Sequence, residues 1–278
     1  FSVIIIYGKS DIMRKLILID SDGTLRKTNG DITENTKKNI KKLIELGNYV
    51  VICTGRPRYH TRKIAKIISS SKIMICSNGS EIYDLENNKV INELTIDNKV
   101  AYKILKYCYK EDIRMTLTIE EDEYVTKDVR RDNQILLSQS NYEDVLKDKK
   151  IKQCLFTSDS IEVLKKLKNY LQNFNEIKIL NEIDRNKEDQ KKWLTIGNVE
   201  TSKGYALKEL ANYLDIPNTD TIAIGNDYND LSMFHECGYS VAVENASEDL
   251  KELVDYVTKS NDEDGVSLFL EKLINKEI

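Results

Sequence analysis

The stretch LILIDSDGTL, at residues 16–25, decides how we interpret the rest of the chain. Its four leading apolar residues, 16–19, indicate a buried strand of a parallel sheet, and the polar residues after them indicate a turn. Asp20 and Asp22 then lie at the carboxyl end of this strand, where open α/β sheets bind their ligands. Because residues i and i+2 of an extended segment point to the same side, the two carboxylates can converge on one point.

Two carboxylates this close repel each other, so they need a cation between them or a shared proton. Mg²⁺ meets this need, because it binds oxygen atoms and often combines one or two carboxylates with a substrate phosphate. The alternative is a plain polar turn, since Asp, Ser and Gly are frequent in turns. A short motif alone does not separate these alternatives. The decision depends on whether the rest of the chain supplies the other residues that such a site needs.

Composition limits the classes of protein that this chain can represent. Its 278 residues suffice for one large or two ordinary domains. A net charge of −4 gives no basic surface of the kind that nucleic-acid binding needs, and no apolar run approaches the roughly 20 residues of a membrane helix. The five cysteines include no Cys-x-x-Cys pair, which favours reduced thiols in a cytoplasmic protein over disulfides or zinc. The sequence carries no signal for an oligomeric state.

The first residues do not fit the pattern of the others. Residues 1–7 are too short for the apolar part of a signal peptide and have no basic residues before them. We expect Met13 to be the natural start and residues 1–12 to be a non-native or irregular extension. A genuine additional strand is the alternative.

Apolar runs and helical periodicities alternate along the first and last parts of the chain. We expect a helix over residues 33–46, a strand over 49–53, a helix with Ile64, Ile67 and Ile68 on its buried face, a strand over 72–76 and, later, a strand over 221–224. Strands that alternate with helices form a parallel sheet with right-handed crossovers. We therefore predict an α/β fold with a doubly wound, Rossmann-like parallel sheet.

The middle of the chain follows a different pattern. From about residue 83 to residue 198, short strands pair around two long helices, over 97–110 and 161–174. Strands and helices in this order describe a small α+β layer. We therefore predict a core domain of residues 1–82 plus 199–278, and an α+β cap domain, residues 83–198, inserted into it.

Polar residues gather at the predicted strand ends. They are Asp20 and Asp22, Thr54 to Arg56, Asn78 and Gly79, Lys203 at a helix start, and Asn226 to Asp230. Because the carboxyl ends of parallel strands meet at one edge, we expect these residues to share one crevice. Phosphoryl transfer needs a nucleophile, a metal ion to offset charge and donors for the phosphate oxygens, and these residue types supply all three.

Each candidate role follows from the chemistry of the side chain. Asp20 would attack phosphorus and form an aspartyl phosphate, and Asp22 would act as general acid and then as general base. The candidate phosphate-binding residues are Thr54, Gly55, Lys203 and Asn229, which offer a hydroxyl, a bare backbone N–H, a charge at a helix N-terminus and an amide. The candidate Mg²⁺ ligands are Asp20, Asp22, Asn226, Asp227 and Asp230, and the candidate substrate contacts are Asn78, Gly79 and Arg56. Taken singly, each segment also fits a turn or a helix cap.

In order and spacing, four segments together resemble the four motifs of the haloacid dehalogenase (HAD) hydrolases. They are DSDGT at 20–24, VICTGR at 51–56, SKG at 202–204 and GNDYNDLSMF at 225–234. The resemblance covers the chain from Met13 onward and is greatest to the Cof-type (class IIB) branch, whose large α+β cap lies between the second and third motifs. It implies that Asp20 is phosphorylated and that Mg²⁺ is the cofactor.

One position departs from the family pattern. The fourth motif usually has Asp where this chain has Asn226, followed here by Asp227. Asn can bind Mg²⁺ through its amide oxygen with less charge, or the loop can shift so that Asp227 becomes the ligand. The spacing favours Asn226.

The resemblance implies a Mg²⁺-dependent phosphatase for a small phosphorylated metabolite of the sugar phosphate, nucleotide or flavin mononucleotide class. Two alternatives stay open: a sugar phosphomutase of the same superfamily, and a catalytically weak sensor that binds a phosphometabolite. Specificity would lie in the cap, where Arg114, Tyr124, Arg130 and Arg131 give no recognisable pattern. For Arg130 and Arg131 we favour a solvated surface pair over a grip on a second anionic group.

Overall fold

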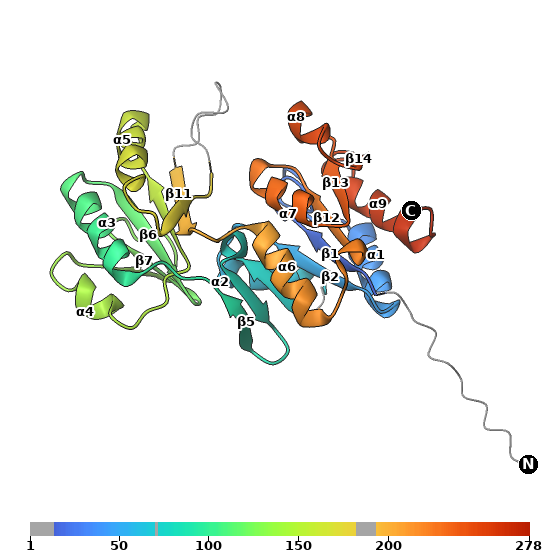
Figure 1. Ribbon diagram of the computed structural model, residues 1–278, viewed down its shortest axis with the longest axis horizontal. Coiled ribbons are helices and arrows are strands. Elements are labelled where there is room, and N and C mark those ends of the chain that lie inside the picture. Colours follow the sequence, from blue (N-terminus) through green and yellow to red (C-terminus); the bar gives the residue numbers. More distant parts are fainter. Residues whose placement is uncertain (1–13, 70–71, 182–192) are drawn as a thin grey trace, which may run out of the picture.

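Strand β1 (Leu16–Ile19) lies near the middle of the larger of two sheets (Figure 1). The computed structural model describes residues 14–69, 72–181 and 193–278. The expectations for residues 1–12 and Met13 lie outside the described residues. Within the described ranges, no helix is both long and apolar enough to cross a membrane.

The larger sheet has the strand order β14-β13-β12-β1-β2-β3-β4-β5. Its other strands are β2 (Tyr49–Cys53), β3 (Ile73–Cys76), β4 (Glu81–Asp84), β5 (Lys89–Glu93), β12 (Thr221–Gly225), β13 (Tyr239–Val243) and β14 (Tyr256–Thr258). The six strands from β14 to β3 are parallel, whereas β4 and β5 are antiparallel. The predicted parallel sheet is confirmed, with an antiparallel hairpin added at one edge.

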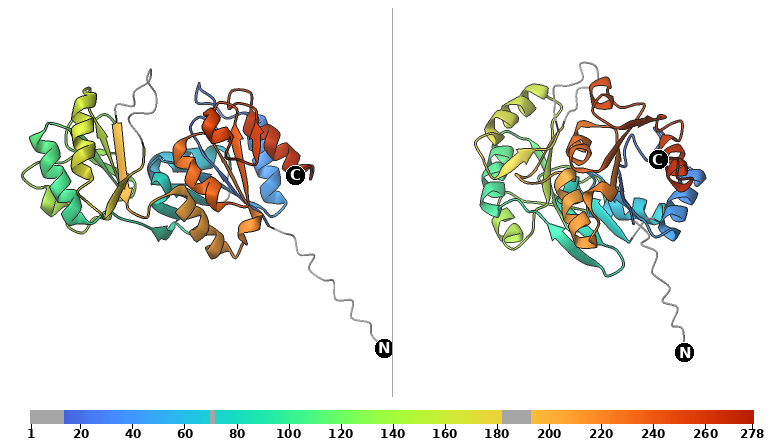
Figure 2. Two further views of the ribbon diagram at one scale, coloured as in Figure 1. Left: turned by 45° about the horizontal axis from the view of Figure 1, so that its top comes forward. Right: turned by 45° about the vertical axis from the view of Figure 1, so that its right-hand side comes forward.

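Helices cover both faces of this sheet (Figure 2). They are α1 (Glu34–Glu45), α2 (Arg58–Ile67), α6 (Lys203–Leu214), α7 (Leu231–Glu236), α8 (Glu248–Lys251) and α9 (Gly265–Ile274), with 3₁₀ turns η1 (Ser77–Gly79), η2 (Asn218–Asp220) and η3 (Tyr228–Asp230). Successive strand residues point to opposite faces. Leu16 and Leu18 therefore pack with α6, α7 and α8, and Ile17 and Ile19 pack with α1, α2 and α9. The sheet is doubly wound, as predicted.

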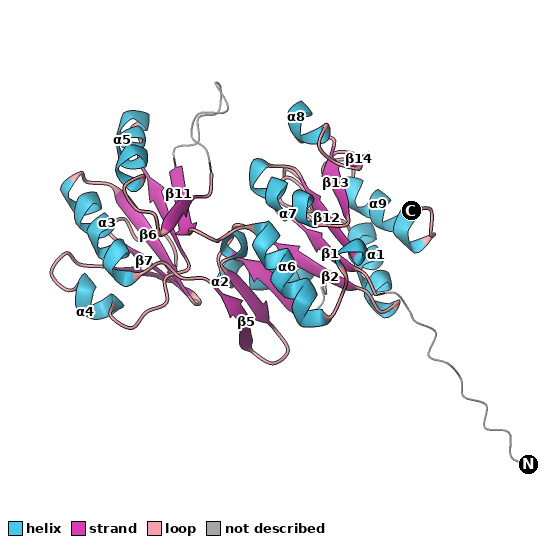
Figure 3. Ribbon diagram, in the orientation of Figure 1, coloured by secondary structure: helices cyan, strands magenta, loops and turns pink. Residues whose placement is uncertain are grey.

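The second sheet forms the core of the cap (Figure 3). Its order is β10-β11-β9-β6-β7-β8, with β6 (Arg114–Ile119), β7 (Asp122–Val125), β8 (Gln134–Leu136), β9 (Gln153–Thr157), β10 (Ile177–Ile179) and β11 (Trp193–Asn198). One buried cluster joins this sheet to α3 (Asn98–Lys110), α4 (Tyr142–Leu146) and α5 (Ile161–Leu171). The predicted inserted α+β cap is present, although we did not expect β8 and α4.

The antiparallel hairpin β4–β5 belongs to the larger sheet. Strand β4 pairs with β3 and β5 pairs with β4, whereas we expected residues after 82 to belong to the cap. The apolar side chains of β4 explain this, because Ile82 is buried in the same cluster as Leu16 and Leu18. We propose that the cap begins after Glu93.

The two connections between core and cap lie side by side. The Nδ2 atom of Asn198, at the end of β11, donates to the carbonyl of Thr95 at 2.9 Å. Lys152, just before β9, is buried and forms ion pairs with Glu93 and, at 3.7 Å, with Glu81. A buried lysine is stable only with such partners, so these contacts fix how the cap meets the core.

One residue of helix α2 was placed wrongly. We expected Ile64, Ile67 and Ile68 on one buried face, but Ile67 is 55% exposed whereas Ile64 and Ile68 are buried. Successive helical residues are about 100° apart around the axis. Ile67 is therefore turned away from Ile68, toward solvent.

Replacing Ile64 with alanine should lower the free energy of unfolding by about 2–5 kcal/mol, because it leaves a cavity in the core. Ile67→Ala, the matched control on the same helix, should change it by about 0.5 kcal/mol or less. Urea unfolding followed by circular dichroism measures both. Equal losses for the two variants would contradict the burial described here.

Candidate active site

Asp20 lies at the end of β1 and faces a buried lysine. Its backbone N–H donates to the carbonyl of Ile224 at 2.9 Å, which fixes it beside β12. The Nζ atom of Lys203 lies 2.5 Å from Oδ1 of Asp20 and 2.5 Å from Oδ1 of Asp230. All three side chains are buried. One cation therefore bridges two carboxylates that come from opposite ends of the sequence.

The charges in this triad depend on one another. Burial raises the pKa of the Asp20 carboxyl to about 7, and the positive charge of Lys203 limits that rise. Burial also acts to lower the pKa of Lys203, but the charges of Asp20 and Asp230 outweigh it and hold this pKa above its usual value. Lys203 thus stays charged at neutral pH.

Lys203 is placed by the start of helix α6, of which it is the first residue. The hydroxyl of Ser202 accepts a hydrogen bond from the backbone N–H of Tyr205 at 3.0 Å and so caps this helix. A cap at Ser202 directs the first turn, and with it Lys203, toward the sheet edge. The predicted position of Lys203 at a helix start is confirmed.

Two arginines hold the side chain of Asp22. Its Oδ2 atom accepts from Nε of Arg56 at 2.5 Å, and its Oδ1 atom accepts from Nη2 of Arg56 at 2.7 Å and from Nη1 of Arg26 at 3.0 Å. Burial acts to raise the pKa of Asp22, but the hydrogen bonds and charges of Arg56 and Arg26 outweigh it and lower the pKa. In this conformation Asp22 is ionised.

Asp230 organises the loop after β12. Its Oδ2 atom accepts from the backbone N–H groups of Asn226 and Asp227, at 2.8 and 2.9 Å, while Oδ1 binds Lys203. Both carboxylate oxygens are therefore engaged by the protein. Asp230 holds Lys203 and the loop in place, and its role as a metal ligand stays a prediction.

Asn226 and Asp227 point in different directions. The Oδ1 atom of Asn226 accepts from the hydroxyl of Thr24 at 2.9 Å, so this amide lies against the turn that follows Asp20. Gly23, at φ 77°, leaves room for it, because a Cβ there would lie 2.6 Å from Nδ2 of Asn226. The carboxylate of Asp227 instead accepts from the N–H of Tyr228 at 2.8 Å and caps η3. Which of the two residues is a metal ligand stays a prediction, with Asn226 favoured by the spacing.

Two of the predicted phosphate-binding residues, Thr54 and Asn229, are joined through Asn78. The Oγ1 atom of Thr54 accepts from the N–H of Arg56 at 3.2 Å, so its own proton can go to another acceptor. The N–H of Asn78 donates to the carbonyl of Thr54 at 3.0 Å, and Nδ2 of Asn229 donates to Oδ1 of Asn78 at 3.0 Å. Gly79 packs on the backbone of Ser202, where its missing side chain permits the contact.

The donors near Asp20 suit a hard cation. Among residues 14–69, 72–181 and 193–278, no three His, Cys, Asp or Glu side chains converge in a way that could hold a metal. The candidate donors beside the turn at 20–24 are the carboxylate of Asp20 and the amide oxygen of Asn226, which are oxygen atoms. Mg²⁺ binds such sites through few protein ligands and keeps several waters. The donor chemistry therefore fits Mg²⁺.

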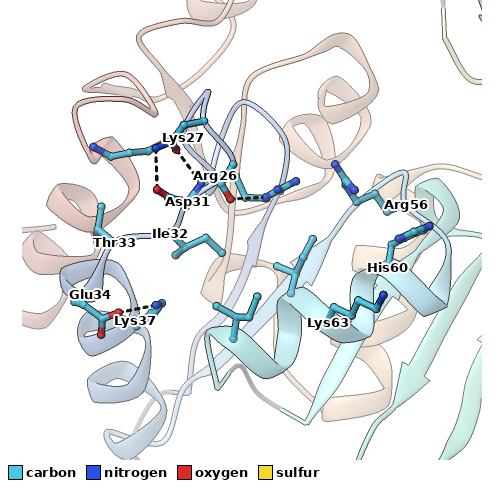
Figure 4. Close-up of a pocket in the computed structure, with 14 residues that line it drawn as sticks. Arg26, Lys27, Asp31, Ile32, Thr33, Glu34, Lys37, Arg56, His60 and Lys63 are labelled. Atoms are coloured by element: carbon cyan, nitrogen blue, oxygen red, sulfur yellow. Dashed lines mark hydrogen bonds and ion pairs between the residues drawn. The ribbon is translucent and has the colours of Figure 1, made fainter. Parts of the chain in front are cut away.

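A groove of about 740 Å³ opens between the segment at residues 26–37 and helix α2 (Figure 4). Arg26 and Lys27 line one side, and Arg56, His60 and Lys63 line the side formed by α2. The two arginines that hold Asp22 thus also border the groove. Asp22 lines a second groove, of about 660 Å³, together with Gly23, Arg26 and Arg56, whereas Asp20 and Lys203 are buried.

Comparison with known proteins identifies the family. Residues 17–270 match the sequence model of the haloacid dehalogenase-like hydrolases. The chain belongs to this family. As a HAD hydrolase it is similar to the phosphatase YwpJ of Bacillus subtilis, which is 29% identical over 293 residues that cover 94% of this chain and 100% of the relative. The 5-amino-6-(5-phospho-D-ribitylamino)uracil phosphatase YwtE of the same organism is 28% identical over 286 residues, covering 94% and 98%.

Solved structures agree with the sequence comparison. TM0651 from Thermotoga maritima superposes with a TM-score of 0.80 at 29% identity, covering 94% of this chain and 97% of that one. The predicted family, the phosphatase class and the α/β fold with an inserted cap are confirmed.

Three residues that contact the candidate site were not predicted from the sequence. Arg26 and Thr24 give no local signal, since a basic residue and a threonine after a turn are common. Gln153 donates through Nε2 to the carbonyl of Gly55 at 3.1 Å. The position of Gln153, a polar residue at the start of the otherwise apolar strand β9, could have indicated a polar contact outside the cap.

Replacing Lys203 with methionine should lower the free energy of unfolding by about 3–5 kcal/mol at pH 8, because two buried carboxylates lose their cation. Without Lys203 the pKa of Asp20 rises further, and an acid with a raised folded-state pKa destabilises most above that pKa. The loss should therefore shrink at pH 5.5. Denaturant titrations at both pH values measure it.

Lys208→Met is the matched control, because Lys208 lies on the same helix but is exposed and pairs with Glu236 at the surface. Its effect should stay below about 1 kcal/mol at either pH. A Lys203→Met loss that does not depend on pH would contradict the bridging role.

Proposed function

We propose that this HAD phosphatase is a Mg²⁺-dependent enzyme that hydrolyses a phosphomonoester of a small metabolite through an aspartyl phosphate on Asp20. The observation that supports this most directly is the bridge between Lys203 and Asp20 at the end of β1, with Asp22 two residues further on in the groove of about 660 Å³ that it lines. A carboxylate beside a fixed cation suits attack on an anionic phosphate, because the cation offsets the repulsion.

The first step transfers the phosphoryl group to the enzyme. Lys203 binds Oδ1 of Asp20, and an oxygen of this carboxylate attacks phosphorus. A bond forms between this oxygen and phosphorus, the bond to the leaving oxygen breaks, and Asp22 gives that oxygen a proton. Asp22 must be protonated for this, so it has to leave the arginines that hold it ionised.

The second step returns the enzyme to its starting state. Water attacks phosphorus, Asp22 takes the proton of this water, and the bond between phosphorus and Asp20 breaks to release inorganic phosphate. The ionised form of Asp22 seen beside Arg56 and Arg26 is the form that this step needs. Thr54, Asn229 and the N–H of Gly55 are the proposed donors to the phosphate oxygens.

Asp20 and Asn226 would hold Mg²⁺, with Asp22 or Asp227 as further candidates. When bound, the ion supplies positive charge that offsets repulsion between the carboxylate and the phosphate. The Asn in place of Asp at 226 lowers the negative charge of the site by one, so we expect weaker binding of the ion than an Asp would give.

The substrate class that fits best is a sugar phosphate, nucleotide-type phosphate or flavin mononucleotide. Met115 and Leu117 of β6 pack in the apolar cluster with the cap helices, so Arg114, Thr116 and Thr118 lie on the other face of the strand. That face is polar and suits a leaving group with hydroxyls. The relative YwtE is named for a substrate with such a phosphorylated ribityl chain.

Asp20→Asn should reduce hydrolysis of p-nitrophenyl phosphate by at least about 10³-fold, because the amide is not a nucleophile. Asp31→Asn, an exposed acid at the rim of the groove, is the control and should keep full activity. Stoichiometric release of phosphate by the wild type separates hydrolysis from phosphoryl transfer to a sugar. Undiminished turnover in Asp20→Asn, or in excess chelator, would contradict the proposal.

Two near-isosteric variants identify the metal ligand in the fourth motif. Asn226→Asp should tighten Mg²⁺ about tenfold, because it adds a negative charge. Asp227→Asn should change the affinity by less than about twofold, because an asparagine also caps η3. Calorimetric titration of Mg²⁺ measures both. A large loss in Asp227→Asn with no gain in Asn226→Asp would assign the ligand to Asp227.

A further inference from the structure

Gln153 is a cap residue that reaches into the core. It is the first residue of β9 and only 5% exposed. Its neighbours Cys154 and Phe156 alternate with it along the strand, and these two pack toward the cap helices. Gln153 shares the opposite face with Thr118, its cross-strand partner on β6. Its side chain thus points from the cap sheet to the active-site edge of the core.

Both ends of the Gln153 amide contact core residues. Nε2 donates to the carbonyl of Gly55 at 3.1 Å, and Oε1 accepts from Nδ2 of Asn78 at 3.4 Å. The partners lie 98 and 75 positions away in sequence. The Gln153 amide therefore makes these hydrogen bonds with the core and not within the cap. It links the two domains.

The Gly55 contact fixes a peptide group of the phosphate-binding loop. The carbonyl of Gly55 accepts from Gln153, and the N–H of the same peptide, that of Arg56, donates to Oγ1 of Thr54 at 3.2 Å. The peptide plane is therefore held at both edges. The residues before it are the proposed phosphate donors, and the side chain after it holds Asp22.

The Asn78 contact extends to the loop of the fourth motif. Asn78 donates to Gln153 through Nδ2 and accepts from Asn229 through Oδ1. Its backbone is in the left-handed region, at φ 58°, which is costly for a residue with a side chain. Gly55 makes room for the amide, since a Cβ there would lie 2.9 Å from Oδ1 of Asn78. The side-chain amides of Gln153, Asn78 and Asn229 thus form a chain of hydrogen bonds from the cap to the two core loops that follow β3 and β12.

We propose that Gln153 is a positioning residue that sets the phosphate-binding loop when the cap is seated on the core. It acts through the Gly55–Arg56 peptide and through Asn78, without touching the phosphate. Displacing the cap removes the partner of the Gly55 carbonyl and of Nδ2 of Asn78, and the loop relaxes. Phosphate binding and cap seating are coupled in this way. This inference rests on the proposed function, in which Thr54 and Gly55 bind phosphate.

Two variants of the full-length chain test the inference. Gln153→Leu removes both hydrogen bonds, and Gln153→Glu keeps the acceptor for Asn78 but cannot donate to Gly55. Each should lower kcat for p-nitrophenyl phosphate and weaken binding of inorganic phosphate by about five- to tenfold, the effect of losing a buried hydrogen bond. Inorganic phosphate has no leaving group for the cap to contact, so its affinity reports on the loop alone.

The matched control is Thr157→Val. Thr157 is the last residue of the same strand β9 and is half-buried, and its hydroxyl forms no hydrogen bond to any core residue that the structure describes. This variant should leave kcat and phosphate affinity unchanged. A role for Gln153 in recognising the leaving group would instead change KM for bulky substrates and spare phosphate binding, and that result would overturn the proposal.

Amide hydrogen exchange gives a readout that does not need activity. The backbone N–H groups of Arg56 and Asn78 should exchange about tenfold faster in Gln153→Leu than in the wild type and Thr157→Val. Unchanged exchange at both amides would overturn the proposal. If the wild type neither hydrolyses p-nitrophenyl phosphate nor binds phosphate, the proposed function fails, while the exchange comparison still decides whether Gln153 orders the loop.

Discussion

The buried ammonium of Lys203 between Asp20 and Asp230 is the interaction on which the site depends. Two carboxylates in the interior repel each other and lose hydration, so the edge of the sheet can hold them only with a cation between them. Asp230 uses its other oxygen to bind two backbone N–H groups of its own loop. The same ion therefore joins β1, helix α6 and the loop after β12 into one rigid unit.

Around this unit the two acids near β1 have opposite environments. Asp20 is buried and its pKa is raised, whereas Asp22 is half exposed and its pKa is lowered by two arginines. A difference of this kind is how neighbouring carboxylates take on distinct chemical tasks. Asp20, the proposed nucleophile, is buried, and Asp22, the proposed proton carrier, lines an open groove.

The sequence is most informative where local chemistry and topology coincide. The apolar run at 16–19 predicts a central strand, and the carboxyl ends of parallel strands converge, so Asp20, Thr54, Lys203 and Asp230 can be grouped from the sequence alone. The sequence analysis placed Ile67 on a buried face and the hairpin β4–β5 in the cap, and both placements were wrong. The exposure of a residue at a helix end and the pairing of strands at a sheet edge both depend on neighbours that are distant in sequence. Arg26 and Gln153 were missed for the same reason: their partners come from tertiary contacts.

The adjacent connections at Thr95 and Asn198 have a consequence for how such enzymes diversify. An insertion whose two ends meet costs the host little conformational entropy, whatever its length. The lobe between these ends can therefore be altered, enlarged or exchanged while the eight-stranded sheet keeps its connectivity. Evolution can thus revise which metabolite is accepted without rebuilding the machinery that cleaves the ester.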